Sequence, residues 1–204
     1  MSTYQSLSAR VLRTLHLSIR STILYSLSTS TPENMYIDTL LSDPDPAILA
    51  LNSALVSFDT EVSSYIPSST YTHITRGLAK LMDTHLLKLL TTRLTRMNSN
   101  GCALMQLNIL VLQQNLKNIE GGAALPYAAL FLDLFTAGPD AIVARAKTHG
   151  RDFGVPGARF SEEEVKRLLV MAYEERLGAE NREASVQAKR ALDGQLLEIS
   201  EFMY

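Results

Sequence analysis

The sequence predicts an all-α protein with about seven to eight helices. Apolar residues recur at steps of three and four along most of the chain, which places them on one face of a helix. No run shows the one-in-two alternation that is typical of a half-buried strand. Hydrophobic residues make up 46% of the chain and charged residues 20%, a balance typical of a protein that buries a core.

The first half of the chain is expected to form three helices and one short helical turn. They are expected at about residues 3–27, 33–41, 46–66 and 69–97, with the short turn at 33–41. The clearest start is the DPDP motif, in which Asp45 is the N-cap and Pro46 takes the first helical position. A proline there costs nothing, because the N–H that it lacks would have no partner in the helix.

Two signals disagree about where the third helix ends. The cluster from Asn98 to Gly101 breaks helices by propensity. The apolar seam nevertheless keeps its phase across this cluster, through Leu94, Met97 and Leu104. The seam favours one continuous or kinked helix of about 50 residues, roughly 75 Å long, while the propensities leave a loop open.

The stretch 98–120 combines an apolar seam with a face of amide side chains. The seam consists of Met105, Ile109, Leu112, Leu116 and Ile119. Glutamine and asparagine fill the positions between them, where a freely solvated helix usually carries Glu and Lys. Such a face is suited to packing against protein, either neighbouring helices of the same chain or a partner.

The second half is expected to form four shorter helices. They are expected at about 126–137, 140–149, 161–178 and 181–204. Ser161 and Glu164 have the spacing of a capping box. We expect two domains: a bundle of long helices over 1–122, and a C-terminal bundle over 123–204 that packs end-on and has a flexible loop at 150–160.

Residue chemistry does not indicate an enzyme. The four histidines lie far apart in the sequence, whereas a metal site needs three or four convergent ligands. They are His16, His73, His85 and His149. Cys102 sits among apolar residues, as a small buried hydrophobe does. The sequence therefore predicts no catalytic residue, no cofactor and no metal.

The net charge, the cysteine count and the length of the apolar stretches limit the possible partners and the compartment. A formal net charge of -2 provides no overall basic field for nucleic acid. A single cysteine excludes an internal disulfide, so the reduced cytosol is the expected compartment. The longest apolar stretches are shorter than the roughly 20 residues of a membrane span, so any membrane association is expected to be peripheral.

One basic cluster is a candidate binding site. Arg145, Lys147, Arg151 and Arg159 gather around the glycine-rich loop. They could form a patch for anionic lipid headgroups or for an acidic partner. The alternative is a solvated loop whose charges are balanced by nearby carboxylates.

Several stretches, in order, resemble one known family. They are DPDPAILALNSALVSFD from Asp43, ITRGLAKLMD from Ile74, NGCALMQLNILVLQQNLKNIE from Asn100, QAKRAL from Gln187 and the terminal LLEISEFMY. Together they resemble the C-terminal region of the Sec-eight subunit of the exocyst, in its filamentous-fungal form. The resemblance covers most of the chain.

That resemblance implies a rod of stacked helical bundles that holds secretory vesicles at the plasma membrane before SNARE-driven fusion. It also implies that the partners are other exocyst subunits, with small GTPases or SNARE-associated proteins as further candidates, and that the protein lies in the cytoplasm at sites of polarised secretion. A peripheral membrane- or GTPase-binding module that uses the basic loop is the alternative.

Members of this family are much longer and carry an N-terminal coiled-coil region for assembly. Nothing like that region precedes Met1, so the chain is expected to be a C-terminal fragment or a truncated gene product. The first helix is then expected to expose apolar surface that favours association.

Overall fold

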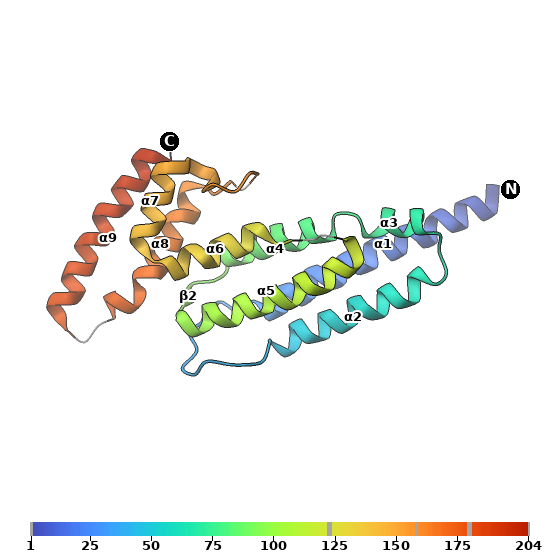
Figure 1. The fold of residues 1–204 in the computed structure, drawn as a ribbon, viewed down its shortest axis with the longest axis horizontal. Helices are drawn as coiled ribbons and strands as arrows, with labels where there is room; N and C mark the ends of the chain where they lie inside the picture. The colour runs from blue at the N-terminus through green and yellow to red at the C-terminus, as the bar shows by residue number, and fades with distance from the viewer. Residues whose placement is uncertain (1, 122–123, 158, 179–180, 204) are drawn as a thin grey trace.

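The computed structural model describes residues 2–121, 124–157, 159–178 and 181–203. It is almost entirely helical, so the all-α prediction is confirmed. Four long helices lie side by side in an elongated bundle, and a second group of helices gathers at one of its ends (Figure 1). The N-terminus projects from the opposite end (Figure 1).

The helices α1, α2, α4 and α5 form the long bundle. The bounds are α1 (Ser2–Ser30), α2 (Pro46–Ser63), α3 (Ser68–Thr75), α4 (Leu78–Thr92), α5 (Ser99–Glu120), α6 (Pro126–Ala137), α7 (Pro139–His149), α8 (Glu162–Leu177) and α9 (Arg182–Phe202). Both α1 and α5 pack against α2 and against α4, so the four helices close around one core. The short α3 packs against α1, while α6 lies against α4 and α5.

The start of α2 follows the prediction. The Asp45 carboxylate accepts a hydrogen bond of 2.7 Å from the Ala47 N–H, and Pro46 occupies the first turn. The helix buries Ile48, Leu51 and Leu55, which recur at steps of three and four. Local sequence was sufficient here, because the cap and its N–H partner are two residues apart.

The expected continuity across residues 93–101 is wrong. Helix α4 ends at Thr92, and α5 begins after Asn98, whose side chain accepts a hydrogen bond of 2.9 Å from the Gly101 N–H. The chain reverses between the two helices, which then pack against one another (Figure 1). Leu94 and Met97 are only 0% and 1% exposed, so the seam had indicated burial correctly but not helix.

The expected helical turn at 33–41 is also wrong. Strand β1 (Asn34–Met35) pairs in parallel with β2 (Arg96–Met97), which places the loop after α1 beside the loop after α4. The same asparagine that caps α5 fixes the following residues, because Asn98 exchanges hydrogen bonds of 3.2 and 2.8 Å with the backbone of Ile37. Pairing with a distant segment satisfies the backbone there in place of a helix.

The third expected helix is divided into α3 and α4. Gly77 separates them with a φ of 84°, a left-handed conformation that glycine adopts without strain. The first backbone N–H groups of α4 are bound by a distant carboxylate. Glu120, the last residue of α5, accepts hydrogen bonds of 2.9 and 3.0 Å from Leu78 and Ala79.

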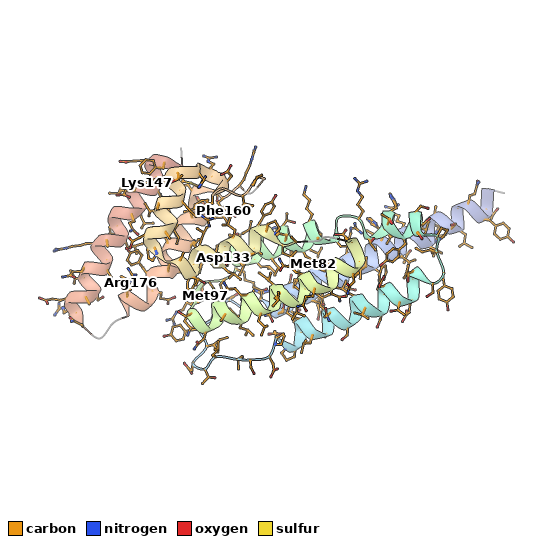
Figure 2. All side chains as sticks on the ribbon, viewed as in Figure 1. Met82, Met97, Asp133, Lys147, Phe160 and Arg176 are labelled. Atoms are coloured by element: carbon orange, nitrogen blue, oxygen red, sulfur yellow. The ribbon has the colours of Figure 1, made fainter. Side chains whose placement is uncertain are left out.

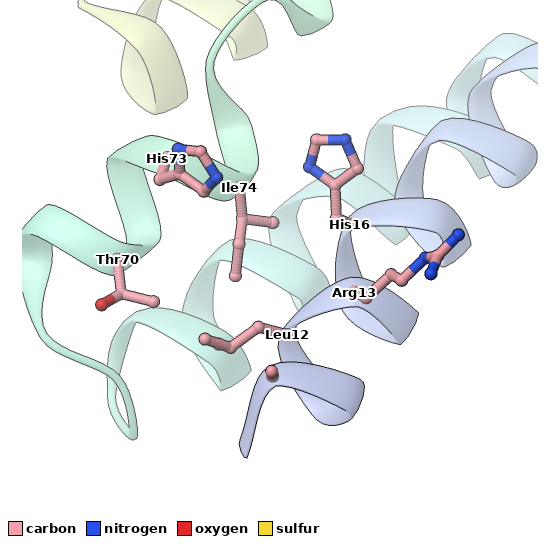
Figure 3. A pocket seen from close by; sticks show the side chains of 7 residues that line it. Leu12, Arg13, His16, Thr70, His73 and Ile74 are labelled. Carbon is pink, nitrogen blue, oxygen red and sulfur yellow. The ribbon is translucent and has the colours of Figure 1, made fainter. Parts of the chain in front are cut away.

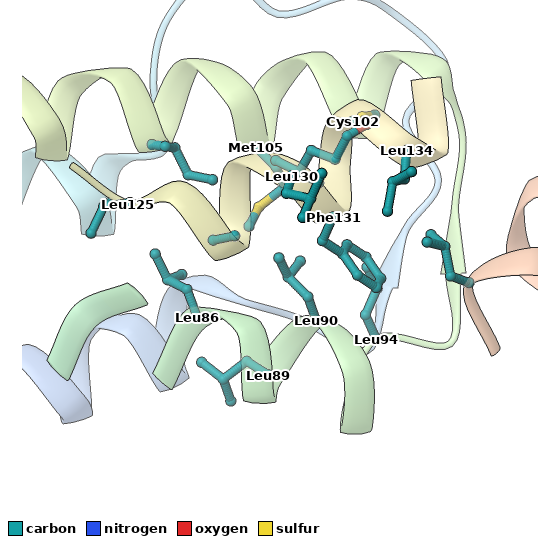
Figure 4. Close-up of a cluster of buried hydrophobic side chains, with 14 of the residues drawn as sticks. Leu86, Leu89, Leu90, Leu94, Cys102, Met105, Leu125, Leu130, Phe131 and Leu134 are labelled. Atoms are coloured by element: carbon teal, nitrogen blue, oxygen red, sulfur yellow. Dashed lines mark hydrogen bonds between the residues drawn. The ribbon is translucent and has the colours of Figure 1, made fainter. Parts of the chain in front are cut away.

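The core extends along the long bundle and continues under α6. Leu90 and Leu94 lie beside the ring of Phe131, which α6 places between α4 and α5 (Figure 4). Figure 2 shows the side chains along the whole molecule, with Met82 inside the long bundle. Burial of this kind contributes about 25 cal/mol per Å² of apolar surface, so the core is the main stabilising term.

Each helix of the second group, from α6 to α9, begins and ends close to its predicted position. Ser161 and Glu164 form the predicted capping box, with bonds of 3.2 and 2.8 Å between each side chain and the other residue's backbone N–H. In the loop before them, the rings of Phe153 and Phe160 are buried edge to face, 5.3 Å apart. Residue 158 lies outside the described residues, and flexibility of the 150–160 loop stays a prediction.

Candidate interaction surfaces

Part of the amide face of α5 is turned inwards. Asn108 accepts a hydrogen bond of 2.9 Å from the Asp45 N–H, and Asn115 donates one of 2.9 Å to the Asn52 carbonyl. Both asparagines are buried, as is Asn98 at the start of the helix. These amides bind the backbone of α2 and of the loop before it. They are therefore structural, and they do not form a partner site.

His85 and Cys102 have structural surroundings. His85 shares a hydrogen bond of 2.9 Å with the Ser28 hydroxyl, and burial lowers its pKa. Cys102 is buried against α6, where its Sγ lies 3.3 Å from the Thr136 hydroxyl, and burial raises the pKa of this thiol. Within the described residues, no three His, Cys, Asp or Glu side chains are grouped as metal ligands.

The predicted basic patch is divided by its contacts. Arg151 donates hydrogen bonds of 3.0 and 2.7 Å to the Met203 carbonyl, so it fixes the end of α9. Lys147 pairs with Glu198 at 2.8 Å and lies 5.2 Å from the Phe202 ring. Arg151 and Lys147 therefore both contact the C-terminal end of α9.

Arg145 and Arg159 are exposed, the first on α7 and the second just before α8. Lys147 lies in this same group of helices, at the end away from the N-terminus (Figure 2). The role of these basic side chains as a site for anionic partners stays a prediction.

Sequence reasoning missed a groove between α1 and α3. It has a volume of about 310 Å³, and its lining is Ala9, Leu12, Arg13, His16, Thr70, His73 and Ile74. The two imidazoles, one on each helix, lie near one another at its edge (Figure 3). No local pattern reveals such a site, because its two walls are more than 50 residues apart in sequence.

The first turns of α1 expose apolar side chains. Residues 3–11 are exposed throughout, and Tyr4, Leu7 and Val11 are 84%, 58% and 51% exposed. The spacing of these three residues places them on one side of the helix. A second apolar groove, of about 460 Å³, lies where α5 meets α6 and includes Leu107 and Leu110. Exposed apolar groups of this kind are typical of protein contact surfaces.

Among the described helices, none combines the length and the apolar character that crossing a bilayer requires.

Comparison with known proteins gives one consistent result. A scan against protein families finds no match. The probable exocyst complex component sec8 of Neurospora crassa is 35% identical to this chain over an alignment 238 positions long, which covers 98% of the chain and 21% of that protein. The chain is therefore similar to an exocyst Sec-eight protein over nearly all of its own length. The resemblance seen in the sequence is thereby confirmed, and the matched part of the relative is C-terminal.

A second match is to the exocyst complex component 4 of Dictyostelium discoideum. It is 33% identical over 119 residues, which cover 57% of this chain and 10% of that protein. The chain therefore spans about a fifth of the length of the first Sec-eight relative and about a tenth of the second. Similarity to the first relative includes nearly all of the surfaces described above, since it covers 98% of the chain.

Proposed function

We propose that this chain is a non-enzymatic segment of an exocyst subunit, which helps to tether post-Golgi secretory vesicles to the plasma membrane before SNARE-mediated fusion. The observation that carries the proposal is the similarity to the Neurospora relative over 98% of the chain. The segment acts through contacts with other exocyst subunits, in the cytoplasm beside the plasma membrane. Small GTPases and SNARE-associated proteins are further candidate partners.

The physical form of the molecule supports this proposal. A tether is a stiff spacer with binding patches along it, so helix length and a continuous core matter more than reactive side chains. The long bundle supplies the length, and α6 extends its core towards α7 and α8. The exposed apolar residues on α1 and at the α5–α6 groove supply surface for contacts.

The test replaces the full-length subunit in cells by a version that lacks the region matching this chain. We expect the complex, purified through another subunit, to lose components and secretion to fall. Leu110→Asp is a milder variant, because Leu110 is 49% exposed and the change leaves the core intact. The proposal would be contradicted if the deletion left both the composition of the complex and secretion unchanged.

The exposed Arg145 and Arg159 favour a second candidate function. In this alternative the chain is a peripheral module that binds anionic membrane or a small GTPase through its basic loop, in which Lys147 and Arg151 support the surface. Attraction between exposed charges weakens with salt, because the Debye length falls to about 3 Å at 1 M.

Flotation of the protein with phosphoinositide vesicles at low and high salt tests the membrane form of this alternative. It requires binding that salt abolishes and that Arg145→Glu with Arg159→Glu weakens. Lys189→Glu, on the exposed surface of α9, is the matched control.

A further inference from the structure

The groove between α1 and α3 is apolar at its floor and basic at its edge. Leu12 and Ile74 form part of the floor, and Ile74 is only 1% exposed. Arg13 and His16 lie on the α1 wall, and His73 lies on the α3 wall (Figure 3). The volume of about 310 Å³ is at the lower end of the range for specific pockets, and it is large enough for one leucine or aromatic side chain.

The charged side chains that line this groove have one sign. Helix α1 carries Arg10, Arg13 and Arg20 and has no Asp or Glu from Ser2 to Ser30. Helix α3 has none either, and no carboxylate lines the groove.

Beside the groove, the Arg20 guanidinium binds the Ile74 and Arg76 carbonyls at 2.9 and 2.8 Å and lies 3.0 Å from His16. The pKa of His16 is lowered by burial and by the positive charge of Arg20 and His73. The Glu120 carboxylate acts on Arg20 but does not line the groove, so the lining itself supplies no negative charge.

We propose that the α1–α3 groove binds an acidic amphipathic helix of a partner protein, which inserts one apolar side chain between the two helices and directs carboxylates at Arg13, His16 and His73. Two adjacent helices present a long concave seam, and a third helix fits such a seam through anchors three or four residues apart. Arg13 and His16 are three residues apart, so carboxylates one helical turn apart on the partner face both of them.

Two other occupants are less suitable, a second copy because of its charge and a bilayer because of its shape. A second copy that packed its own α1 into the groove would bring Arg10 and Arg13 against the same arginines, because this helix has no acidic residue to offer. A bilayer is a flat surface and cannot enter a cleft whose floor is recessed between two helices. The proposal goes beyond tethering and does not depend on the exocyst assignment, because the site consists only of residues of this chain.

The experiment measures peptide binding by fluorescence anisotropy on the full chain. Two helical peptides of 16 to 18 residues share the same leucine and phenylalanine positions, and the flanking positions carry glutamate in one peptide and lysine in the other. We expect the glutamate peptide to bind at least tenfold more tightly than the lysine peptide, with a difference that shrinks as salt is raised.

Charge reversal in the groove supplies the decisive variant. Arg13→Glu with His73→Glu changes two exposed side chains of the groove. We expect this double variant to bind the glutamate peptide at least tenfold more weakly and to bind the lysine peptide more tightly. Arg10→Glu is the matched control, since it makes the same charge change on α1 outside the lining of this groove, and its effect should stay below threefold. Circular dichroism checks that every variant is folded.

Several outcomes would overturn the proposal. These are equal affinity for the two peptides, binding of neither peptide, or a loss with Arg10→Glu as large as that with the double variant. Light scattering that shows a dimer dispersed by the double variant would identify a second copy as the occupant. Vesicle flotation that the double variant abolishes, without peptide binding, would identify a membrane.

Discussion

At the scale of single residues, one buried carboxylate holds the long bundle to α6. Asp83 is 2% exposed, and its oxygens accept hydrogen bonds of 2.9 to 3.1 Å from the N–H groups of Tyr127 and Ala128. It acts as a cap for α6 although it belongs to α4. Burial raises the pKa of this carboxyl, whereas the two N–H groups act in the opposite direction.

Removing this carboxylate should cost stability in a graded way. We expect Asp83→Ala to lower the free energy of unfolding by roughly 1–3 kcal/mol, because two buried N–H groups lose their acceptor. Asp83→Asn keeps one acceptor oxygen and needs no buried charge, so its loss should be smaller. Urea unfolding measures both, with the exposed Asp193→Ala as control; equal losses for the alanine and asparagine variants would contradict this account.

His85 should make stability depend on pH. Its pKa in the folded protein is lowered, chiefly by burial, so the unfolded chain takes up a proton first as the pH falls. The contribution of neutral His85 is therefore complete above pH 6.5, the unfolded value, and is lost below it.

His85→Gln removes the titrating ring and should reduce the difference in urea midpoint between pH 7.5 and pH 5. The exposed His149→Gln is the comparison. A difference in midpoint that His85→Gln leaves unchanged would show that this ring is not responsible.

Caps divide into those that sequence can reveal and those that it cannot. Asp45 and the Ser161–Glu164 pair lie within three residues of the N–H groups they bind, so a local motif identified them. Asp83 and Glu120 cap helices from more than 40 residues away. Only the packed arrangement of helices brings such groups together, which is why they were not predicted.

At the scale of elements, the reversal between α4 and α5 depends on close backbone packing. A Cβ atom built on Gly101 would lie 1.8 Å from the Met35 carbonyl oxygen, so only glycine fits where β1 meets the first turn of α5. The same glycine gave a helix-breaking signal in the sequence. The break itself lies just before Gly101, at residues 93–98, since Gly101 belongs to the first turn of α5. The continuous seam was misleading because buried residues in a turn can keep helical spacing by chance.

Gly101→Ala should therefore destabilise the protein. We expect a loss of about 1–3 kcal/mol or more, since the backbone of β1 has to move. Gly194→Ala is a matched control, because Gly194 is an exposed residue inside α9 with no atom near its missing Cβ. Helix propensity predicts a gain of about 0.5–1 kcal/mol there. Thermal unfolding of both variants measures these two effects. Equal changes in melting temperature would contradict the close approach of Gly101 to the backbone of β1.

At the scale of the whole molecule, α6 belongs to both ends. It packs against α4 and α5 on one side and against α7 and α8 on the other. The helix class, most helix positions and the family could be predicted from local patterns and from ordered resemblance. The way the two ends meet depends on α6 and on long-range contacts, so the predicted division after residue 122 stays a prediction.

Two shortened chains test that division. A chain that ends at residue 122 lacks α6, so the core around Leu90 and Leu94 loses the cover of Phe131 (Figure 4). We expect it to unfold at a lower temperature and to bind more of a hydrophobic dye than a chain that ends at residue 138. Equal stability of the two would favour a boundary at 122.

The overlap of α6 with α4 and α5 also has a mechanical consequence. The N-terminus and α9 lie at opposite ends of the long axis (Figure 1), so tension between them would pull α6 lengthwise along its two neighbours. Sliding along that direction has to break the contacts of Phe131 and its neighbours together, whereas peeling would break them one after another. Loaded in shear, a helix pair can transmit force along the rod, and single-molecule pulling from the two ends would measure the force at which α6 slips.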